Sequence, residues 1–380
     1  MNAPAFKYPL YETGHHRLTP DERAEFNAQF DVICNSGQFR NGQWSAALSG
    51  KLCEMTGYRY AIPTDSGTTA LAIIAAWVNK IHRLRNVLVP NLTFQATYNA
   101  LARGLPSVTY LPMTPGDTNG TNLNIGTLHN EATMNMIPGF REVCESDAIV
   151  TVGLGGAHNN FTSPDVIVIE DCCQDWISKP HTGNHRAISF DPSKVVTGLS
   201  GGGAILTDSV DLAHWASRAI SNDYQAEWDS GISPVFGKHT ITEVDAMHVL
   251  MMLTTVNERL EDRRKILTYY KERLGEFLLG EDFSNHDASK ALVWLPNFSE
   301  SEWLSIKELR DSQGLADYRW IYRRHHNGGA DIDILLSLPL SERKGINSMM
   351  EDWLDFLAGL LQRLKKENQA ANWSKPGYGH

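Results

Sequence analysis

The sequence predicts an α/β protein with a mostly parallel central sheet and helices on both of its faces. Short apolar runs typical of buried strands alternate with helix-like stretches between residues 58 and 103. Further apolar runs of strand length follow at 107–112, 148–152 and 166–169. Strands that alternate with helices form parallel sheets, because a parallel pair needs a crossover connection. With 380 residues, 42% of them hydrophobic, the chain can bury a large core and form a second, smaller domain.

Capping and turn signals predict the first helices. Thr19 and Pro20 indicate a helix start, since threonine caps helices and proline favours their first position. Asn41 and Gly42 predict a turn before a helix at residues 45–56. That turn is either a plain connection between helices or a part of the active site.

The next turn has the composition of a phosphate-binding site. A strand at residues 58–63 leads into the hydroxyl-rich turn 64–69, and an apolar helix follows to residue 81. Free N–H groups and the helix dipole attract phosphate to such a helix start. A strand at 87–90 and a helix at 93–103 continue the alternation.

Two later stretches carry the residues that we expect to be catalytic. The apolar run 166–169 is followed by Glu170 and Asp171, so an acid lies at the end of a buried strand. An acid at that position can pair with the protonated pyridine nitrogen of a pyridoxal phosphate cofactor. A strand then leads into a turn that carries Lys194, ahead of the glycines at 201–203. A lysine desolvated there can form a Schiff base, which is how pyridoxal phosphate is held. A surface lysine in a glycine-rich loop is the alternative.

Taken in order, these motifs resemble the DegT/DnrJ/EryC1/StrS-type aminotransferases, fold-type-I pyridoxal-phosphate enzymes that act mostly on nucleotide-linked keto-sugars. The matching words are SGTTAL at 66–71, PNLTFQAT at 90–97, EDCCQ at 170–174, SFDPSK at 189–194 and GGAILT at 202–207. The resemblance implies an aspartate aminotransferase-like fold with pyridoxal 5'-phosphate as the cofactor.

The resemblance also implies individual roles. Lys194 and Asp171 would be catalytic. Phe94 would stack on the pyridine face, Gln174 would reach the ring oxygen if the chain turns into a helix there, and Ser189 would offer its hydroxyl to the phosphate. The alternatives are a core residue for Phe94 and ordinary surface or capping groups for Gln174 and Ser189. The predicted cofactor-binding set is Gly67, Thr68, Thr69, Phe94, Asp171, Gln174, Ser189, Lys194 and Lys238.

The chain departs from the family pattern at two places. The family usually has asparagine after the lysine and an acid before the paired glycines, where this chain has Val195 and Gly201, so we expect the lysine turn to be held differently. Family members commonly place an Asn-x-Arg pair where Lys238 and Thr240 stand, and that asparagine reaches the cofactor phosphate of the partner subunit. A lysine ammonium could act there as a point charge, which implies a homodimer with shared active sites. The alternative for Lys238 is an exposed loop lysine.

The domain boundary is expected after residue 245, with a large domain over residues 1–245 and a smaller α+β domain over residues 246–380. One long helical stretch is predicted at 242–275, with Arg263 on a solvated face. The remaining predicted elements are strands near 291–295 and 334–338 and helices near 302–313 and 346–365.

A basic and aromatic cluster at residues 318–326 is the candidate for binding an anionic substrate. Arg319 and Arg323 are its predicted substrate-binding residues, because a guanidinium group binds carboxylate or phosphate bidentately. A solvated face with packing aromatic residues is the alternative.

Together these features predict a transaminase that moves an amino group from an amino acid, with glutamate as the common family donor, to a keto-sugar or similar nucleotide-linked acceptor. A pyridoxal-phosphate-dependent decarboxylase or lyase acting on an amino-acid-bearing metabolite or modified nucleotide is the alternative enzyme. A non-catalytic regulatory or scaffolding protein is a third reading, and the presence of both Lys194 and Asp171 argues against it.

The composition disfavours several classes of binding partner and location. The net charge of -10 disfavours a surface built to hold nucleic acid. Five cysteines without zinc-like spacing indicate reduced thiols in the cytoplasm and no metal site. No segment has the length and apolar character of a membrane span, and residues 1–7 lack signal-peptide features, so a soluble protein is expected.

Overall fold

The computed structural model describes residues 18–90, 93–105, 109–113, 147–158, 167–179, 181, 185–222, 235–278, 283–284, 286–299, 320–325, 331–338, 340, 355, 357–359, 361–363 and 366. The chain divides into two compact units. One comprises His15–Thr114 and Asn124–Val256, and the other comprises Met1–Gly14, Pro115–Leu123 and Asn257–His380. The boundary predicted from the sequence, after residue 245, lies within a helix of the first unit and stays a prediction.

The first unit contains a seven-stranded sheet in the order β1-β7-β6-β5-β4-β2-β3. Pairings from β6 through β5, β4 and β2 to β3 are parallel, and β7 runs antiparallel to both of its neighbours. The α/β prediction with a mostly parallel sheet is therefore confirmed. The strands are β1 (Tyr60–Thr64), β2 (Asn86–Pro90), β3 (Thr109–Met113), β4 (Asp147–Val152), β5 (Ile167–Asp171), β6 (His185–Ser189) and β7 (Gly203–Thr207).

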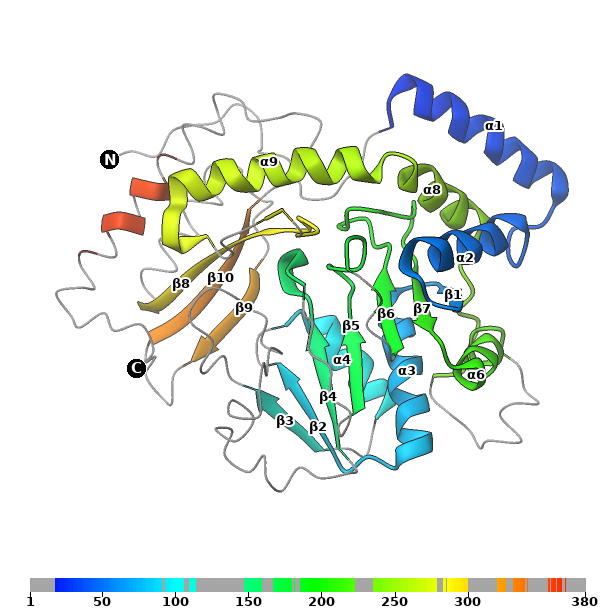
Figure 1. The fold of residues 1–380 in the computed structure, drawn as a ribbon, viewed down its shortest axis with the longest axis horizontal. Helices are drawn as coiled ribbons and strands as arrows, with labels where there is room; N and C mark the ends of the chain where they lie inside the picture. The colour runs from blue at the N-terminus through cyan, green and yellow to red at the C-terminus, as the bar shows by residue number, and fades with distance from the viewer. Residues whose placement is uncertain are drawn as a thin grey trace. The chain divides into compact units, whose positions relative to one another are not determined.

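Helices pack on this sheet as the alternation predicted. Helix α3 contacts β6 and β7, whereas α2 and α8 lie side by side next to β1 (Figure 1). Thr19 caps α1 as expected, because its Oγ1 accepts from Glu22 N at 3.2 Å while Glu22 Oε2 accepts from Thr19 N at 2.7 Å. The helices are α1 (Pro20–Ser36), α2 (Gln43–Thr56), α3 (Gly67–His82), α4 (Gln95–Gly104), α6 (Val210–Ile220) and α8 (Glu243–Leu253), with a 3-10 turn η2 (Leu154–Gly156). Among the described helices, none combines the length and the apolar character that crossing a membrane requires.

The long helix predicted over residues 242–275 is two helices. Helix α8 ends at Leu253, and α9 (Val256–Leu274) begins after Thr254 and Thr255. Both the N–H and the hydroxyl of Thr254 donate to Met251 O, at 3.2 and 2.7 Å. Threonine side chains compete with the helical backbone in this way, which explains the break that apolar periodicity did not indicate.

The second unit contains α9, the 3-10 turn η3 (Gly275–Phe277) and an antiparallel sheet in the order β8-β10-β9. Its strands are β8 (Ala291–Ser299), β9 (Trp320–His325) and β10 (Asp331–Leu338). These confirm the strands expected near 291–295 and 334–338. Residues 302–313, where a helix was expected, lie outside the described residues, and 357–359 and 361–363 are helical within the predicted closing helix.

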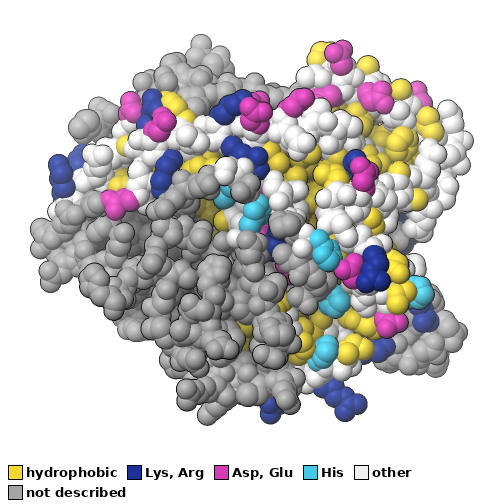
Figure 2. All heavy atoms as spheres, in the orientation of Figure 1, with side chains coloured by type: hydrophobic (Ala, Val, Ile, Leu, Met, Phe, Trp, Pro, Cys, Tyr) yellow, Lys and Arg dark blue, Asp and Glu magenta, His cyan; other side chains and the backbone are white. Residues whose placement is uncertain are grey.

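The expectation for Arg263 was wrong. Its side chain is buried, with 1% exposed, and it donates from Nε to Ala288 O at 2.7 Å and from a terminal nitrogen to Ser289 O at 2.9 Å. Its neighbour Lys265 is exposed and pairs with Glu261 at 3.0 Å. Side chains of both signs are interspersed over this helix at the top of Figure 2. Neighbouring basic residues of this run therefore differ in role: Arg263 is buried and binds the loop at residues 288–289, whereas Lys265 is exposed to solvent.

The N-terminus of helix α2 is capped by a side chain of α8 and not by the side chain of its own N-cap residue. Gly42 at its N-cap has no side chain, and the carboxylate of Glu243 accepts hydrogen bonds from the N–H groups of Gly42, Trp44 and Ser45 at 2.9, 2.7 and 3.2 Å. A Cβ on Gly42 would lie 2.6 Å from Glu243 Oε2, so the close approach requires glycine. Glu243 is 1% exposed and lies at the positive end of the helix dipole.

We expect Glu243→Ala to lower the free energy of unfolding by about 2–3 kcal/mol, because it leaves buried N–H groups without an acceptor. Urea unfolding of the cofactor-free protein, followed by circular dichroism, measures this change. The matched control is Glu243→Gln, which keeps one acceptor oxygen and should lose less. An unchanged midpoint for the alanine variant would contradict the capping role.

Candidate functional site

Most of the predicted cofactor-binding residues lie at the carboxyl edge of the parallel strands or in the loops that follow it. Because β7 is antiparallel to both neighbours, its first residue lies at this edge, and Gly203 pairs with Thr64 on one side and Ser189 on the other. Ligands of open α/β sheets bind at this edge, where the loops that follow the strands converge.

Glycines allow the predicted phosphate-binding turn at residues 64–69, called the phosphate turn below, to pack closely against the ends of β5 and β6. A Cβ on Gly67 would lie 2.7 Å from Ser189 Cβ and 2.8 Å from Cys173 Sγ. A Cβ on Gly203 would lie 2.4 Å from Gly67 N. No larger side chain fits at either place, so the start of α3, Ser189 and the segment after Asp171 are packed together as the sequence predicted.

The turn before α3 has an ordered N-terminus. Ser66 is the N-cap, and its Oγ accepts from Thr69 N at 3.1 Å and lies 2.9 Å from Thr69 Oγ1. Gly67 and Thr69 are buried, whereas Thr68 is half-buried. The start of α3 therefore lies beside Ser189 at the positive end of a helix, which is favourable for an anion.

The carboxylate of Asp171 is held from two sides. Thr97 Oγ1 donates to its Oδ2 at 2.8 Å, and Cys173 N donates to its Oδ1 at 3.2 Å. Thr93 Oγ1 lies 2.8 Å from Thr97 Oγ1 and extends this chain of hydroxyls. Asp171 is 5% exposed, so its orientation is set by these bonds. Sequence reasoning did not assign Thr97, although threonines four residues apart at a helix start were a visible signal.

Phe94 lies beside this chain of hydroxyls as the N-cap of α4. Its side chain is 48% exposed, whereas the adjacent Thr93 is buried. The alternative that Phe94 is a core residue is therefore wrong. Its stacking role stays a prediction.

Gln174 does not begin a helix, because residues 173–175 form a turn. Its Oε1 accepts from Gly155 N at 2.8 Å, which ties it to η2 after β4. Ser189 is 6% exposed, and its Oγ accepts from Asp191 N at 3.2 Å. Both polar side chains lie at the strand ends, and their contacts to a cofactor stay predictions.

Lys194 lies half-buried in a turn closed by its own N–H, which donates to Asp191 O at 2.9 Å. The pKa of the neighbouring Cys173 thiol is raised well above its ordinary value by burial and by the Asp171 carboxylate, while Lys194 acts in the opposite direction. Lys194 and Asp171 therefore both lie within electrostatic range of Cys173. The thiol stays neutral at neutral pH and does not compete with the amine as a nucleophile.

Helix α8 holds the loop after Lys194. Asp245 Oδ1 accepts from Ser200 N at 2.8 Å, and Oδ2 lies 2.9 Å from Ser200 Oγ. His248 Nδ1 lies 2.7 Å from Thr197 O, so the ring nitrogen donates. These contacts hold the loop that contains the departures at Val195 and Gly201, and whether that support differs from the family's stays a prediction. His248 itself is buried, with 3% exposed.

The remaining predicted residues are more distant in the chain. Lys238 is exposed and forms an isolated bridge with Ser221, next to His239, whose carbonyl accepts from Asp65 N at 2.7 Å. Arg323 lies in β9 of the second unit, opposite Ile334. Arg319 lies outside the described residues, so the substrate role of both arginines stays a prediction.

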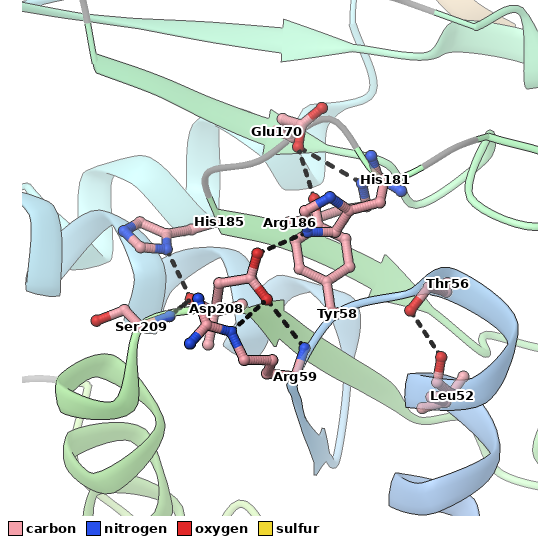
Figure 3. Close-up of polar contacts among 11 residues, drawn as sticks. Leu52, Thr56, Tyr58, Arg59, Glu170, His181, His185, Arg186, Asp208 and Ser209 are labelled. Atoms are coloured by element: carbon pink, nitrogen blue, oxygen red, sulfur yellow. Dashed lines mark hydrogen bonds and ion pairs between the residues drawn. The ribbon is translucent and has the colours of Figure 1, made fainter.

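Strand β5 presents a second carboxylate to a buried cluster of charges that sequence reasoning missed. Glu170, 2% exposed, lies 2.9 Å from Lys179 Nζ. It also lies 3.5 Å from Arg186 Nε and accepts from Tyr58 Oη at 3.2 Å (Figure 3). Burial and the Glu170 carboxylate raise the pKa of Tyr58. Successive residues of a strand point to opposite faces, so β5 gives Asp171 to the site and Glu170 to this cluster. In the part of the chain that the structure describes, no group of His, Cys, Asp and Glu side chains has an arrangement that could hold a metal ion.

A model of the DegT/DnrJ/EryC1/StrS aminotransferase family matches residues 20–307 of this chain. The GDP-perosamine synthase of Caulobacter vibrioides is 25% identical over 245 residues, 61% of this chain and 62% of the relative. The GDP-4-keto-6-deoxy-D-mannose 3-dehydratase of Escherichia coli is 26% identical over 204 residues, 48% of each chain. This chain thus matches less than two thirds of the length of either relative.

Solved structures share the fold. DesI, solved in the presence of its TDP-sugar product, has a TM-score of 0.68 at 20% identity and covers 98% of this chain and 97% of its own. NtdA of Bacillus subtilis, solved with bound PMP, has a TM-score of 0.67 at 19% identity, covering 90% and 83%. The predicted fold class is confirmed, and so is the family resemblance.

We expect Gly67→Ala to destabilise the cofactor-free protein by about 1–3 kcal/mol, because its methyl group would overlap Ser189 and Cys173. The matched control is Gly50→Ala in α2, where nothing lies within 4 Å of the added Cβ. That helical substitution should stabilise by about 0.5–1 kcal/mol. Urea unfolding of both variants measures the difference, and equal midpoints would show that the close approach at Gly67 is not required.

Proposed function

The chain belongs to the DegT/DnrJ/EryC1/StrS aminotransferase family, and on that premise we propose that it is a pyridoxal-phosphate-dependent aminotransferase. The observation that carries the proposal is the convergence at one sheet edge of a buried, oriented carboxylate (Asp171), a half-buried amine (Lys194) and a helix start packed against Ser189. A non-catalytic protein would have no need to keep all three.

The residues at this edge fit pyridoxal phosphate. The tight packing at Gly67 leaves backbone N–H groups, rather than side chains, at the start of α3, and these groups with Thr68, Thr69 and Ser189 would hold the phosphate. Bound there, the cofactor supplies an electron sink that stabilises negative charge on a substrate carbon.

Asp171 would keep the proton on the pyridine nitrogen. Its two hydrogen bonds, from Thr97 and from Cys173 N, aim the carboxylate without neutralising it. Phe94, whose ring is half-exposed beside these groups, would cover one face of the pyridine. Because Gly155 N occupies the amide oxygen of Gln174, and residues 173–175 form a turn rather than the expected helix, only the amide nitrogen of Gln174 would contact the ring oxygen. This arrangement holds the cofactor ring in one orientation.

Lys194 would have two tasks, which are to hold the cofactor covalently through Nζ and then to carry a proton at that atom. Half-burial reduces the hydration of its ammonium group, and the loop contacts to Asp245 and His248 keep its backbone in place. The neutral Cys173 thiol beside it leaves the amine as the base.

We propose an amino acid, glutamate in the first instance, as the amino donor and a nucleotide-linked keto-sugar as the acceptor. The names of the GDP-perosamine synthase relative and of DesI with its TDP-sugar product support this class of acceptor. Arg319 and Arg323 are the proposed residues for its anionic part. A lyase is the second candidate function, which the 3-dehydratase relative favours.

The proposed assembly is a homodimer in which Lys238 serves the partner's phosphate site. Bridges at Lys238 and Thr240 flank His239, whose ring faces Asp65 of the same chain. Lys238 is exposed, so its ammonium group is accessible to a second subunit. The free thiols of Cys34, Cys53, Cys172 and Cys173 support the proposed cytoplasmic location.

Lys194→Ala tests the assignment of the catalytic amine. We expect glutamate to convert the wild-type cofactor spectrum to that of the pyridoxamine form, and the variant to lose both this conversion and covalent cofactor fixation by borohydride. The matched control, Lys51→Ala, removes an exposed lysine of α2 and should behave as wild type. Cofactor fixed on the Lys194 variant would refute the assignment, whereas an unchanged wild-type spectrum with glutamate would favour the lyase.

Mixing subunits tests the shared site. Lys238→Ala should weaken cofactor binding by about 1.5–3 kcal/mol, the range for hydrogen bonds to charged groups. Lys194→Ala and Lys238→Ala subunits are mixed at a cofactor concentration below the dissociation constant of the Lys238 variant. Mixed dimers then carry both lesions in one site and none in the other, so activity should recover to about one quarter of wild type. A monomer in solution, or mixed dimers without recovery, would sink this proposal.

A further inference from the structure

His239 connects the phosphate turn, residues 64–69, to helix α4. Asp65 N donates to His239 O at 2.7 Å, and the ring Nδ1 lies 2.8 Å from Asp65 Oδ2. The other ring nitrogen, Nε2, lies 3.0 Å from a terminal guanidinium nitrogen of Arg103 in α4. A Cβ on Gly237 would lie 2.5 Å from Nε2, so the ring occupies a space that only glycine leaves open. Only 16% of the His239 side chain is exposed, so the ring is held between the two charged groups.

The chemistry of Arg103 determines the tautomer of this ring. A guanidinium group has donors and no acceptor, so Nε2 of His239 must be the unprotonated acceptor. The ring proton then lies on Nδ1, which donates to the Asp65 carboxylate. His239 is therefore neutral, with its tautomer specified, between a cation and an anion.

Asp65 immediately precedes the N-cap of α3. Its carboxylate is held by His239 on one side, and Ser66 Oγ lies 3.1 Å from its Oδ1 on the other. Burial acts to raise the pKa of Asp65, but the hydrogen bonds from His239 and Thr69 outweigh it and lower the pKa, so the group is charged at neutral pH. The carboxylate lies beside the phosphate turn, where its orientation affects how an anion is received, and its hydrogen bonds with His239 and Ser66 fix that orientation.

We propose that His239 is a positioning residue for the phosphate turn: as the Nδ1–H tautomer held by Arg103, it binds Asp65 and sets the start of α3 in the conformation that receives a cofactor phosphate. This inference rests on the proposed function and adds a residue to it. The contacts at Asp65 carry it, since Thr64 pairs with Thr240 and Asp65 N with His239 O in the same segment. The backbone bonds align this segment with the turn, and the ring bond orients the Asp65 side chain.

Two substitutions separate the two bonds of the ring. The amide nitrogen of asparagine falls near Nδ1 of histidine, so His239→Asn keeps the donor to Asp65 and loses Arg103. The amide of glutamine reaches the place of Nε2, so His239→Gln keeps the acceptor for Arg103 and loses Asp65. Each variant is compared with wild type for binding of pyridoxal phosphate and of pyridoxal, which lacks the phosphate, by titrating the cofactor-free protein and following tryptophan fluorescence.

The glutamine variant should bind pyridoxal phosphate on the order of tenfold more weakly than wild type, the loss expected for one hydrogen bond to a charged group. Its affinity for pyridoxal should be unchanged, because only the phosphate seat is disturbed, and the asparagine variant should resemble wild type with both ligands. Equal losses for both ligands would show general structural damage and overturn the proposal, as would a glutamine variant that binds pyridoxal phosphate normally.

The tautomer is measured independently of any ligand. In cofactor-free protein labelled with 15N-histidine, the resonance that disappears in His239→Asn should show a protonated Nδ1 and an unprotonated Nε2. The opposite tautomer or a charged ring at neutral pH would overturn the proposal. A wild-type protein with the expected tautomer that binds neither ligand would instead contradict the proposed function.

Discussion

Two buried carboxylates in the first turn of α8 hold two loops in place, the turn before α2 and the loop after Lys194. Glu243 accepts three N–H groups at the start of α2, and Asp245 accepts the N–H of Ser200 in the loop after Lys194. A buried carboxylate is costly unless it is hydrogen-bonded, and loop N–H groups inside a protein need acceptors. The two carboxylates and the loop N–H groups therefore supply each other's hydrogen-bond partners. The shapes of these two loops are therefore set by a helix that contributes no predicted catalytic residue.

Strand β5, which carries the predicted catalytic acid Asp171, has a buried carboxylate on each of its two faces. Asp171 is bound only by a hydroxyl and an N–H group, which orient it and leave its charge available. Glu170, its neighbour, is surrounded by Lys179 and Arg186 in a cluster without contact to water. Glu170 of β5 and Arg186 of β6 stand opposite each other in the sheet, so their ion pair is compatible with this register of the two strands. That register determines where Asp171 lies.

Local sequence signals predicted most of the fold. The strands from residue 58 to residue 207 and the capped start at Thr19 follow from apolar runs, turn residues and caps, which act over a few neighbouring positions. Two predictions failed for the same reason. The break after Leu253 depends on the hydroxyl of Thr254 bonding a carbonyl, and the burial of Arg263 depends on carbonyls of residues 288 and 289. A polar side chain in a helical run has several possible partners, and its sequence neighbourhood does not choose between them.

The sequence by itself determined the order of the chemical groups: a phosphate turn at 64–69, an acid at 171 and an amine at 194, each at the end of a predicted strand. Parallel topology brings strand ends to one edge, so this order was enough to predict a common site. Only the tertiary structure decided how each group is held. Thr97, Asp245 and His239 touch the site from segments far away in the chain, and hydrogen bonds between such segments depend on distances that only the packed fold defines.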